Sequence, residues 1–233
     1  MSRVGIVVGM QSEAAEISTA WRKQGQEQHP LIAISAANPH RAYEGARSLI
    51  SQGAGAILSF GLAGGLVPTL ETGDTVVASE VMLPDGTQIE THAAWRSSLT
   101  AALSDRTRIV IGAIAGQDSA IVTRAAKAAL RLRTGAVAVD MESHAAAAAA
   151  NEAGRPFMAL RVILDPTGRA IPATALAGLG PHGESRALAV LARLVVRPWD
   201  LPALLALGRA NTRALTVLGS LAADLAPGFV LGM

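Results

Sequence analysis

The stretch RVGIVVGMQSEAAEISTAWRKQ, residues 3–24, joins a short apolar run to a longer polar segment. Arg3 to Val8 is rich in β-branched side chains and ends at Gly9, which predicts a buried first strand. Ser12 follows as a candidate N-cap of a helix, and Glu13 lies in its first turn, near the positive end of the helix dipole. A strand, a tight turn and a capped helix are therefore predicted in direct succession.

This alternation of strand and helix continues along the chain. Further apolar runs predict strands at Leu31–Ser35, Ala56–Ser59, Thr75–Val81, Arg108–Ile114, Ala136–Val139 and Phe157–Ile163. Helices are expected at Asn38–Ile50, Ala93–Leu103, Thr123–Arg133, Glu142–Ala153, Gly183–Val196 and Pro202–Leu225. Strands separated by helices of about ten or more residues favour a mostly parallel sheet that is covered on both faces. We therefore predict an α/β fold, a three-layer αβα sandwich with a central, mostly parallel (mixed) twisted sheet.

The composition limits the class of protein. Of the 233 residues, 50% are hydrophobic and 16% are charged, so the chain is too apolar for intrinsic disorder. It contains no Pro-, Gly- or Ser-rich linker, which predicts one domain over residues 1–233. The lack of cysteine excludes a disulfide scaffold, thiol nucleophiles and cysteine zinc sites, and it fits a cytoplasmic enzyme. Neither a signal peptide nor a membrane-spanning run is expected.

The charge balance argues against nucleic acid as a partner. The 20 Lys and Arg residues barely exceed the 18 Asp and Glu residues, and aromatic residues make up only 3% of the chain. Nucleic-acid sites usually show a clustered basic footprint and aromatic platforms for stacking. Arg124, Lys127 and Arg131 form a basic stripe on one predicted helix, for which a solvated face is the simplest interpretation.

Acidic side chains recur at the predicted carboxyl ends of strands. Glu13, Asp118, Glu142 and Asp165 each follow a strand, and the glycine-rich loop Gly61–Gly65 follows another. Ligands of open α/β sheets bind beyond these ends, so the segments should meet along one edge. Each acid also has a structural interpretation as a first-turn acid, an N-cap or part of a turn, and the loop could be a tight turn.

Motifs for metals and cofactors are not found in the sequence. The five histidines show no ligand spacing such as HExxH, so surface or packed histidines are the better interpretation. The glycine-rich loop matches neither GxGxxG nor the Walker phosphate motif, and no GxSxG nucleophile elbow is present. We expect neither a metal nor an organic cofactor.

Four segments together resemble the purine nucleoside phosphorylase/uridine phosphorylase superfamily, closest in style to its methylthioadenosine/S-adenosylhomocysteine nucleosidases. The segments are VGIVVGMQSE (4–13), SFGLAGGL (59–66) with Gly73-Asp74 behind it, VDMES (139–143) and PFMALRVILD (156–165). The resemblance implies a nucleoside phosphorylase-like domain. It also implies an enzyme that cleaves the N-glycosidic bond of a nucleoside, either a nucleosidase or a nucleoside phosphorylase.

The later part of the chain narrows the resemblance. The DMES box at residues 140–143, Asp165-Pro166, Ile171-Pro172 and the leucine-rich ending after Arg197-Pro198 resemble the hopanoid-associated phosphorylases. Those proteins are assigned to the release of adenine from adenosylhopane during bacterial hopanoid synthesis. The implied substrate is a 5′-substituted adenosine with a large apolar group. The Ala/Leu-rich C-terminal third could supply an apolar wall or a membrane-surface contact, and ordinary packing or a dimer interface is the simpler interpretation.

The resemblance also implies roles for individual residues by position. Asp165 matches the acid that donates a proton to the purine at N7, Glu142 the carboxylate that binds the ribose hydroxyls, and Glu13 the carboxylate that engages the attacking water. Substrate contacts are implied for Met141, Ala63, Gly64, Ala120, Ile121 and Phe60. Bond cleavage builds negative charge on the base and positive charge on the sugar, which suits these groups. Burial and nearby carboxylates should raise the pKa of Asp165.

Hydrolysis is favoured over phosphorolysis, because a phosphorylase needs fixed cations for its phosphate. Related phosphorylases carry one arginine where this chain has Gly73 and another after the first strand, where this chain has Gln11 to Glu16. Glu13 would repel phosphate, and Arg41 is the remaining candidate for a phosphate contact. A phosphate-dependent purine nucleoside phosphorylase and a non-enzymatic nucleoside- or lipid-binding protein on the same fold are the alternatives.

Two departures from the family pattern lie near the implied site. Leu164 replaces the serine that commonly precedes the aspartate, and Ala36-Ala37-Asn38 replaces a glycine-rich turn. Either change could alter specificity or lower activity. The resemblance further implies a homodimer or larger homo-oligomer in the cytoplasm, with membrane-surface association as an open alternative.

Overall fold

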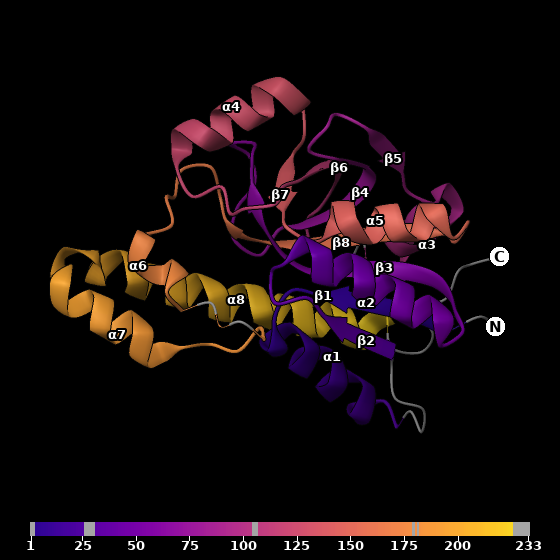
Figure 1. The fold of residues 1–233 in the computed structure, drawn as a ribbon, viewed down its shortest axis with the longest axis horizontal. Helices are drawn as coiled ribbons and strands as arrows, with labels where there is room; N and C mark the ends of the chain where they lie inside the picture. Colours follow the sequence, from indigo (N-terminus) through magenta and orange to yellow (C-terminus); the bar gives the residue numbers. More distant parts are fainter. Residues whose placement is uncertain (1–2, 26–30, 104–106, 179, 181, 226–233) are drawn as a thin grey trace.

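The computed structural model describes residues 3–25, 31–103, 107–178, 180 and 182–225. Its strands are β1 (Arg3–Val8), β2 (Leu31–Ile34), β3 (Ala54–Gly65), β4 (Thr75–Met82), β5 (Gln88–Glu90), β6 (Ile109–Gly116), β7 (Ala138–Asp140) and β8 (Phe157–Asp165). Its helices are α1 (Gln11–Lys23), α2 (Pro39–Ser51), α3 (Ala93–Leu103), α4 (Arg124–Thr134), α5 (Ser143–Glu152), α6 (Ala173–Leu176), α7 (Ala187–Val196), the short 3-10 helix η1 (Pro198–Asp200) and α8 (Leu201–Leu225). The strands form one mixed sheet with helices on both sides, which confirms the predicted α/β class (Figure 1).

The sheet is mixed because two groups of parallel strands meet in antiparallel pairs. Strands β2, β1, β3 and β8 pair in parallel in that order, and so do β4, β6 and β7. The groups are joined where β3 pairs with β7 and where β4 pairs with β8, both antiparallel. Because β3 pairs with both β7 and β8, strands β3, β8, β4, β6 and β7 close into a circuit. The carboxyl ends of β1, β3 and β8 lie together at one edge.

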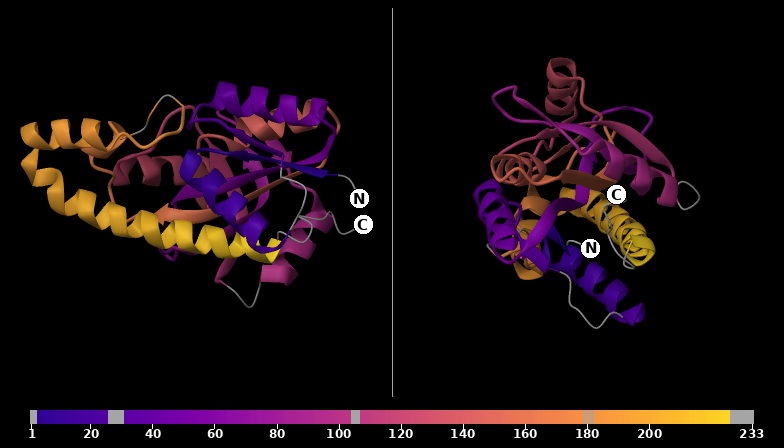
Figure 2. Two further views of the ribbon diagram at one scale, coloured as in Figure 1. Left: turned by 90° about the horizontal axis from the view of Figure 1, so that it is seen from below. Right: turned by 90° about the vertical axis from the view of Figure 1, so that its right-hand side faces the viewer.

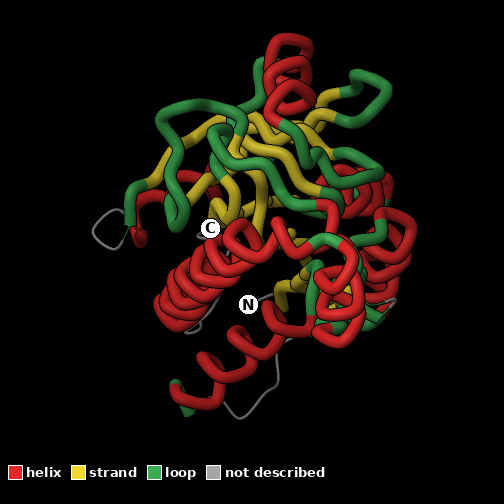
Figure 3. The backbone as a smooth tube through the Cα atoms, turned by 90° about the vertical axis from the view of Figure 1, so that its left-hand side faces the viewer, coloured by secondary structure: helices red, strands yellow, loops and turns green. Residues whose placement is uncertain are grey.

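Two groups of helices cover the two faces of the sheet. Helices α2 and α5 pack on one face, where small side chains such as Ala46 and Ala146 let the helices approach the strands closely. Helices α1, α3 and α8 cover the other face, where Ile17, Trp95 and Leu218 belong to a second apolar core. In Figure 3 the strands lie in the upper part of the molecule, with helices below them and to their right.

The glycine-rich segment predicted as a loop is instead the end of β3. Gly61–Gly64 pairs in parallel with the end of β8, and Gly64 and Gly65 pair antiparallel with β7. Glycine runs have little intrinsic preference for strands, so only the two neighbouring strands make this segment extended. As a result, β3 carries backbone N–H groups directly to the edge where the acids were expected.

Helix α1 begins at Gln11 with Met10 at its N-cap, whereas Ser12 was predicted to be the cap. The carboxylate of Glu13 accepts hydrogen bonds at Oε2 from the backbone N–H groups of Gly9 and Met10, at 2.7 and 2.9 Å. These N–H groups belong to the turn whose donors would otherwise lack a partner. The acid therefore fixes the turn between β1 and α1 in place of the serine hydroxyl.

The C-terminal helices form a hairpin that projects from the body. Helix α7 and the first part of α8, joined by η1, extend beyond the sheet (Figure 2, left). In α8 the buried residues begin at Ala210, and the helix packs against α1 and β8. Helix α7 has no buried residue. Within the described ranges, no helix is long and apolar enough to cross a membrane.

Candidate active site

The three predicted acids come from three elements and meet at one edge of the sheet. Glu13 is in the first turn of α1, Glu142 is the N-cap of α5 directly after β7, and Asp165 ends β8. Their exposed fractions are 4%, 5% and 3%, respectively. A buried carboxylate is costly unless it is hydrogen-bonded or paired with a cation. The partners of each acid therefore decide what it can do.

Glu13 is held mainly by backbone donors. In addition to the two bonds from the β1–α1 turn, its Oε1 accepts a hydrogen bond from the N–H of Leu62 on β3, at 2.8 Å. Burial raises the pKa of Glu13, and the guanidinium of Arg161 and the three N–H donors oppose the rise. The carboxylate is therefore fixed between the ends of β1 and β3.

Arg161, on β8, is a wholly buried cation among these acids. Its Nε lies 2.6 Å from Asp140 Oδ2, and its Nη2 lies 3.3 Å from Glu142 Oε2. Its Nη1 has no hydrogen-bond partner among the residues that the structure describes. A guanidinium donor that is buried without a partner is costly, and Arg161 is wholly buried, so only a small polar group such as a water molecule can satisfy Nη1.

Two glycines leave the space in which this cluster forms. A Cβ atom at Gly61 would lie 2.7 Å from Arg161 Nη1 and 2.8 Å from Glu13 Oε1. A Cβ atom at Gly9 would lie 2.8 Å from Glu142 Oε1 and 3.3 Å from Glu13 Oε2. Glycine at both positions therefore allows the guanidinium and the two carboxylates to approach the same backbone. The distances also show that Glu13 and Glu142 are close neighbours.

The pKa of Glu142 is raised to about 8. Burial is the largest cause, and the negative charges of Asp140 and Glu13 add to it, whereas Arg161 lowers the pKa. One guanidinium thus serves three carboxyl groups, and a proton on Glu142 relieves the repulsion among them. The cluster carries an excess of negative charge whenever all three acids are ionised.

Asp165 is paired with a lysine to which the sequence analysis gave no role in the site. Lys127, on α4, is wholly buried, and its Nζ lies 2.5 Å from Oδ2 and 2.7 Å from the backbone oxygen of Asp165. Burial raises the pKa of Asp165, as predicted, and Lys127 opposes the rise. The predicted contribution of nearby carboxylates is wrong, because the charged neighbours that act on this pKa are Lys127 and Arg169.

The interpretation of the basic stripe as a solvated face is also wrong for Lys127. Arg124 is exposed on α4, but Lys127 faces the body of the protein together with Leu130. Residues three apart share a helix face, so the apolar side chain of Leu130 indicated in the sequence that Lys127 also points inward. The available signal for Arg161 was a single charge inside an otherwise apolar strand.

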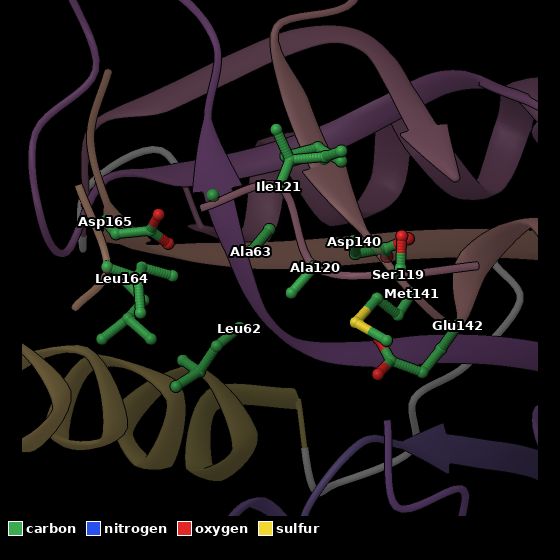
Figure 4. A pocket seen from close by; sticks show the side chains of 13 residues that line it. Leu62, Ala63, Ser119, Ala120, Ile121, Asp140, Met141, Glu142, Leu164 and Asp165 are labelled. Atoms are coloured by element: carbon green, nitrogen blue, oxygen red, sulfur yellow. The ribbon is translucent and has the colours of Figure 1, made fainter. Parts of the chain in front are cut away.

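A cavity of about 150 Å³ opens between Asp165 and Glu142. Figure 4 shows Asp165 on one side of this cavity and Met141 with Glu142 on the other. The remaining lining is mostly apolar, with Ser119 and Asp140 as its polar members, and it comprises Leu62, Ala63, Gly64, Ser119, Ala120, Ile121, Val139, Asp140, Leu164 and Ile171. Such a lining suits a flat ligand with an apolar body and a few polar groups.

A second cavity, of about 440 Å³, adjoins the first. Both are lined by Leu62, Met141, Glu142 and Leu164, so the two cavities are contiguous. The second also contains Glu13, and it extends away from the acids between the hairpin helices. Its far part is lined by Ala175, Gly178, Ala187, Val190, Leu204, Leu207 and Gly208, together with the polar residues Ser185, Arg186 and Asn211. The cavity is therefore acidic at one end and mostly apolar at the other.

All the predicted site residues except Phe60 line one of the two cavities. Phe60 is wholly buried in the apolar core on the side of α1 and α8, so its ring cannot contact a ligand there. Arg41, the candidate for a phosphate contact, is exposed on α2 and lines neither cavity. Asp118 lies 3.0 Å from His144 Nε2 and is mostly exposed. Among the described residues, no group of three His, Cys, Asp or Glu could hold a metal ion.

The segment that replaces a glycine-rich turn is strained. Ala36 and Ala37 have φ angles of 57° and 53°, in the left-handed region that favours glycine. The N–H of Ala37 donates to the backbone oxygen of Gly9 at 3.2 Å, and Ala37 lines the second cavity. The turn therefore keeps a glycine-like conformation even though both positions carry side chains.

Comparison with known proteins identifies the family of the chain. The sequence profile of the phosphorylase superfamily matches residues 3–196. The chain therefore belongs to the phosphorylase superfamily, and it is an enzyme that acts on nucleosides. No curated protein sequence matches the chain significantly.

Several solved structures share the fold. The 5′-methylthioadenosine/S-adenosylhomocysteine nucleosidase of Neisseria meningitidis, in complex with methylthio-immucillin-A, has a TM-score of 0.72 and 16% identity, covering 97% of this chain and 98% of that chain. The nucleosidase of the same name from Helicobacter pylori has a TM-score of 0.68 and 19% identity, covering 95% and 97%. The futalosine hydrolase of Helicobacter pylori has a TM-score of 0.63 and 22% identity, covering 71% and 88%. At these identities the similarity establishes the fold.

Proposed function

We propose that this enzyme hydrolyses the N-glycosidic bond of a 5′-substituted adenosine and releases adenine, with adenosylhopane as its substrate. The observation that carries the proposal is the convergence of Glu13, Glu142 and Asp165 on two contiguous cavities. A nucleoside placed across them has its base beside Asp165, its sugar beside Glu142 and its 5′ group in the larger cavity. None of these steps requires a metal or an organic cofactor.

The smaller cavity is assigned to the purine. Asp165 lies at its edge, and burial raises the pKa of this carboxyl group, which favours the protonated form. The acid donates its proton to N7 as negative charge builds up on the leaving base. Ala120 and Ile121 line the same cavity and pack against the base. Lys127 then stabilises the carboxylate that remains once the proton has been transferred.

Glu142 and Met141 are assigned to the sugar. Both line the two cavities where these join, with Ala63 and Gly64 on the side of the base. The carboxylate of Glu142 accepts hydrogen bonds from the ribose hydroxyls, and these donors favour its ionised form over the protonated form of the empty site. Its negative charge then stabilises the positive charge that develops at the anomeric carbon.

Glu13 and Arg161 are assigned to the attacking water. The unpaired Nη1 of Arg161 and the Oε1 of Glu13 converge at Gly61, so one water can accept from the first and donate to the second. Burial raises the pKa of Glu13, which makes it a better acceptor for the proton of that water. Phosphate is disfavoured here, because Arg161 already faces three carboxyl groups and a further anion would be repelled.

The larger cavity is assigned to the 5′ substituent. Its far part lies between α7 and α8 and is lined mostly by apolar side chains, with Ser185, Arg186 and Asn211 as its polar members. A fused-ring hydrocarbon gains free energy when it is transferred into such a lining, whereas a free hydroxyl group does not. This asymmetry favours adenosylhopane over adenosine. The proposal places the enzyme in the cytoplasm at a membrane surface, where a hopanoid substrate partitions, and as a homodimer or larger homo-oligomer.

The test of the proposal is chromatographic. The protein is incubated with adenosine, methylthioadenosine and adenosylhopane, each with and without phosphate, and free adenine is measured. We expect release without phosphate and the highest kcat/KM with adenosylhopane. Release only in the presence of phosphate would instead identify a phosphate-dependent purine nucleoside phosphorylase. Measurable binding without any release would identify a non-enzymatic nucleoside- or lipid-binding protein.

The role of Asp165 is tested by Asp165→Asn, which keeps the size of the side chain and removes the acidic proton. We expect kcat to fall by about 10²–10⁴-fold with a much smaller change in KM, the usual range for loss of a general acid. Asp118→Asn is the matched control, because Asp118 is exposed and lines neither cavity. Unchanged turnover of Asp165→Asn would remove Asp165 from this role.

A further inference from the structure

The projecting hairpin presents an apolar surface that the protein itself leaves uncovered. Between Ser185 and Arg209, all of which the structure describes, no side chain is buried. The exposed large apolar side chains of this segment are Leu188, Leu191, Val195, Val196, Trp199, Leu201 and Leu205. Exposed apolar surface that is concentrated in this way marks an interaction site, whereas single scattered residues do not.

Helix α7 carries two apolar stripes, and only one of them serves the cavity. Ala187 and Val190 line the larger cavity. Leu188, Leu191 and Val195, at spacings of three and four residues, share a different face, and their exposed fractions are 81%, 55% and 83%. The outer stripe is therefore not explained by substrate binding or by packing of the chain.

The charges of the hairpin favour an anionic partner. From Arg186 to Arg209 the charged residues are four arginines and one aspartate. Asp200 lies 3.5 Å from the Nε of Arg197. Arg186 lines the larger cavity, so Arg193 and Arg209 remain for an external partner. Trp199 lies in η1, at the turn between the two helices, and the guanidinium of Arg197 lies 5.8 Å from its ring centre. An apolar face with arginines and an exposed tryptophan is the pattern of a helix that lies in the interface of a lipid bilayer.

A second copy of the chain fits this surface less well. In a two-fold dimer the same patch meets itself, so two hairpins that each carry more arginines than acidic residues would be brought together. Anionic lipid headgroups would neutralise these arginines, and the acyl region would accept the outer stripe. We propose that the outer stripe of α7, together with η1, docks on the surface of an anionic bilayer.

The inference rests on the proposed function in one respect: docking on a bilayer would place the mostly apolar end of the larger cavity beside the lipid that contains the substrate. Vesicle binding is measured without substrate, so the proposal of membrane docking and the proposal of nucleoside hydrolysis are tested independently. Adenine release from methylthioadenosine, measured in the same preparations without vesicles, reports on the chemistry alone.

The test is flotation of the full-length protein with phosphatidylcholine vesicles that contain or lack phosphatidylglycerol. We expect flotation with the anionic vesicles, a decrease with added salt, and a blue shift of tryptophan emission that Trp199→Phe abolishes. The triple variant Leu188→Gln, Leu191→Gln, Val195→Gln should lower the partition coefficient by about tenfold or more, because it removes three apolar side chains from the contact. It should leave the circular dichroism spectrum and methylthioadenosine cleavage unchanged.

Leu132→Gln is the matched control, because Leu132 is 89% exposed on α4, outside the hairpin. It should bind vesicles like the wild type. Equal vesicle binding by the triple variant and the wild type would overturn the proposal. So would wild-type protein that binds no vesicles but self-associates in a way that the triple variant abolishes, because a second copy would then cover the stripe.

Discussion

Asp165 and Lys127 form a buried ion pair at the point where the base is proposed to leave. A cation beside a carboxyl group favours its ionised form, which opposes the role of a proton donor. Burial raises the pKa of Asp165, and Lys127 holds this rise back. The pair therefore sets the pH above which the acid has lost its proton, and it prepares a partner for the carboxylate that proton transfer leaves behind.

Replacing Lys127 should change the pH dependence of turnover. If Asp165 must be protonated, activity falls as the pH rises through its pKa. Lys127→Met keeps an apolar stem of similar length and removes the cation, so the pKa of Asp165 should rise and the alkaline limb of the kcat profile should move to higher pH. Arg124→Met, an exposed position on the same helix, should leave the limb in place. A limb that does not move in Lys127→Met would contradict the pairing.

Glu142 should make the folded state less stable as the pH rises. Its pKa is about 8 in the folded protein and 4.5 in the unfolded reference, so between these values the folded state binds more protons. The contribution is present below the lower value and is lost as the pH rises through the upper one. Each pKa unit corresponds to about 1.4 kcal/mol, so the loss amounts to about 5 kcal/mol at most.

Urea unfolding measured from acid to alkaline pH checks this sign. Glu142→Gln should flatten the decline of the free energy of unfolding across that window, and Glu90→Gln, at an exposed position on β5, should not. A free energy of unfolding that rises with pH across the window, in the wild type but not in Glu142→Gln, would refute the raised pKa.

Relieving the strained turn after β2 should make the protein more stable. Ala36→Gly relieves a left-handed alanine, and we expect the free energy of unfolding to increase by about 1 kcal/mol. Ala33→Gly, within β2, is the control and should decrease it by roughly 0.5–1 kcal/mol, because glycine weakens an ordinary strand. Thermal unfolding of the two variants gives the comparison, and a loss at both positions would contradict the strain.

At the scale of elements, the end of β3 is a strand because its neighbours provide hydrogen-bonding partners, and it is rich in glycine because the site needs space. Gly61 faces Arg161 Nη1 and Glu13 Oε1, and Gly64 lies close to the carboxylate of Asp165. The sequence shows the glycines but not the reason for them. Without the pairing of β3 to β7 and β8, a run of glycine predicts a loop.

Gly61→Ala tests this account of β3. The added methyl group would lie within 3 Å of two buried side-chain ends, so Arg161 and Glu13 must shift. A shift of this size in the two groups proposed to hold the attacking water should lower kcat/KM on the order of hundredfold. Gly168→Ala, where a Cβ atom meets no other atom within 4 Å, should have wild-type activity. Wild-type kinetics in Gly61→Ala would show that the two groups do not need that space.

The helices show which parts of an element local sequence can predict. Apolar periodicity and a capping residue indicate α2, because this helix buries one face and begins after Asn38 with Pro39 in its first turn. The direction of Lys127 was missed because a charged side chain is assigned to solvent unless a buried partner is known. The start of α1 was missed because a glutamate in the first turn, Glu13, accepts the hydrogen bonds from the N–H groups of Gly9 and Met10. The usual sequence signal is instead a serine hydroxyl at the N-cap.

At the scale of the whole molecule, the sequence predicts the class of fold and the edge that carries the acids. Parallel strands place their carboxyl ends together, so Glu13 and Asp165 could be expected near one another before the structure was known. The sequence does not predict the closed circuit of strands, which comprises β3, β8, β4, β6 and β7. The order of the strands and their antiparallel pairing depend on contacts between segments that are distant in the sequence. The exposure of the outer stripe of α7 could not be predicted either, because Leu188, Leu191 and Val195 have the same apolar pattern as the buried face of a helix.

We propose that Glu13 and Arg161 direct water, and not phosphate, onto a nucleoside held between Glu142 and Asp165. The most direct measurement is mass spectrometry of the sugar released from methylthioadenosine in a buffer that contains phosphate. We expect unphosphorylated methylthioribose in an amount equal to the adenine released. Methylthioribose 1-phosphate as the product would contradict it.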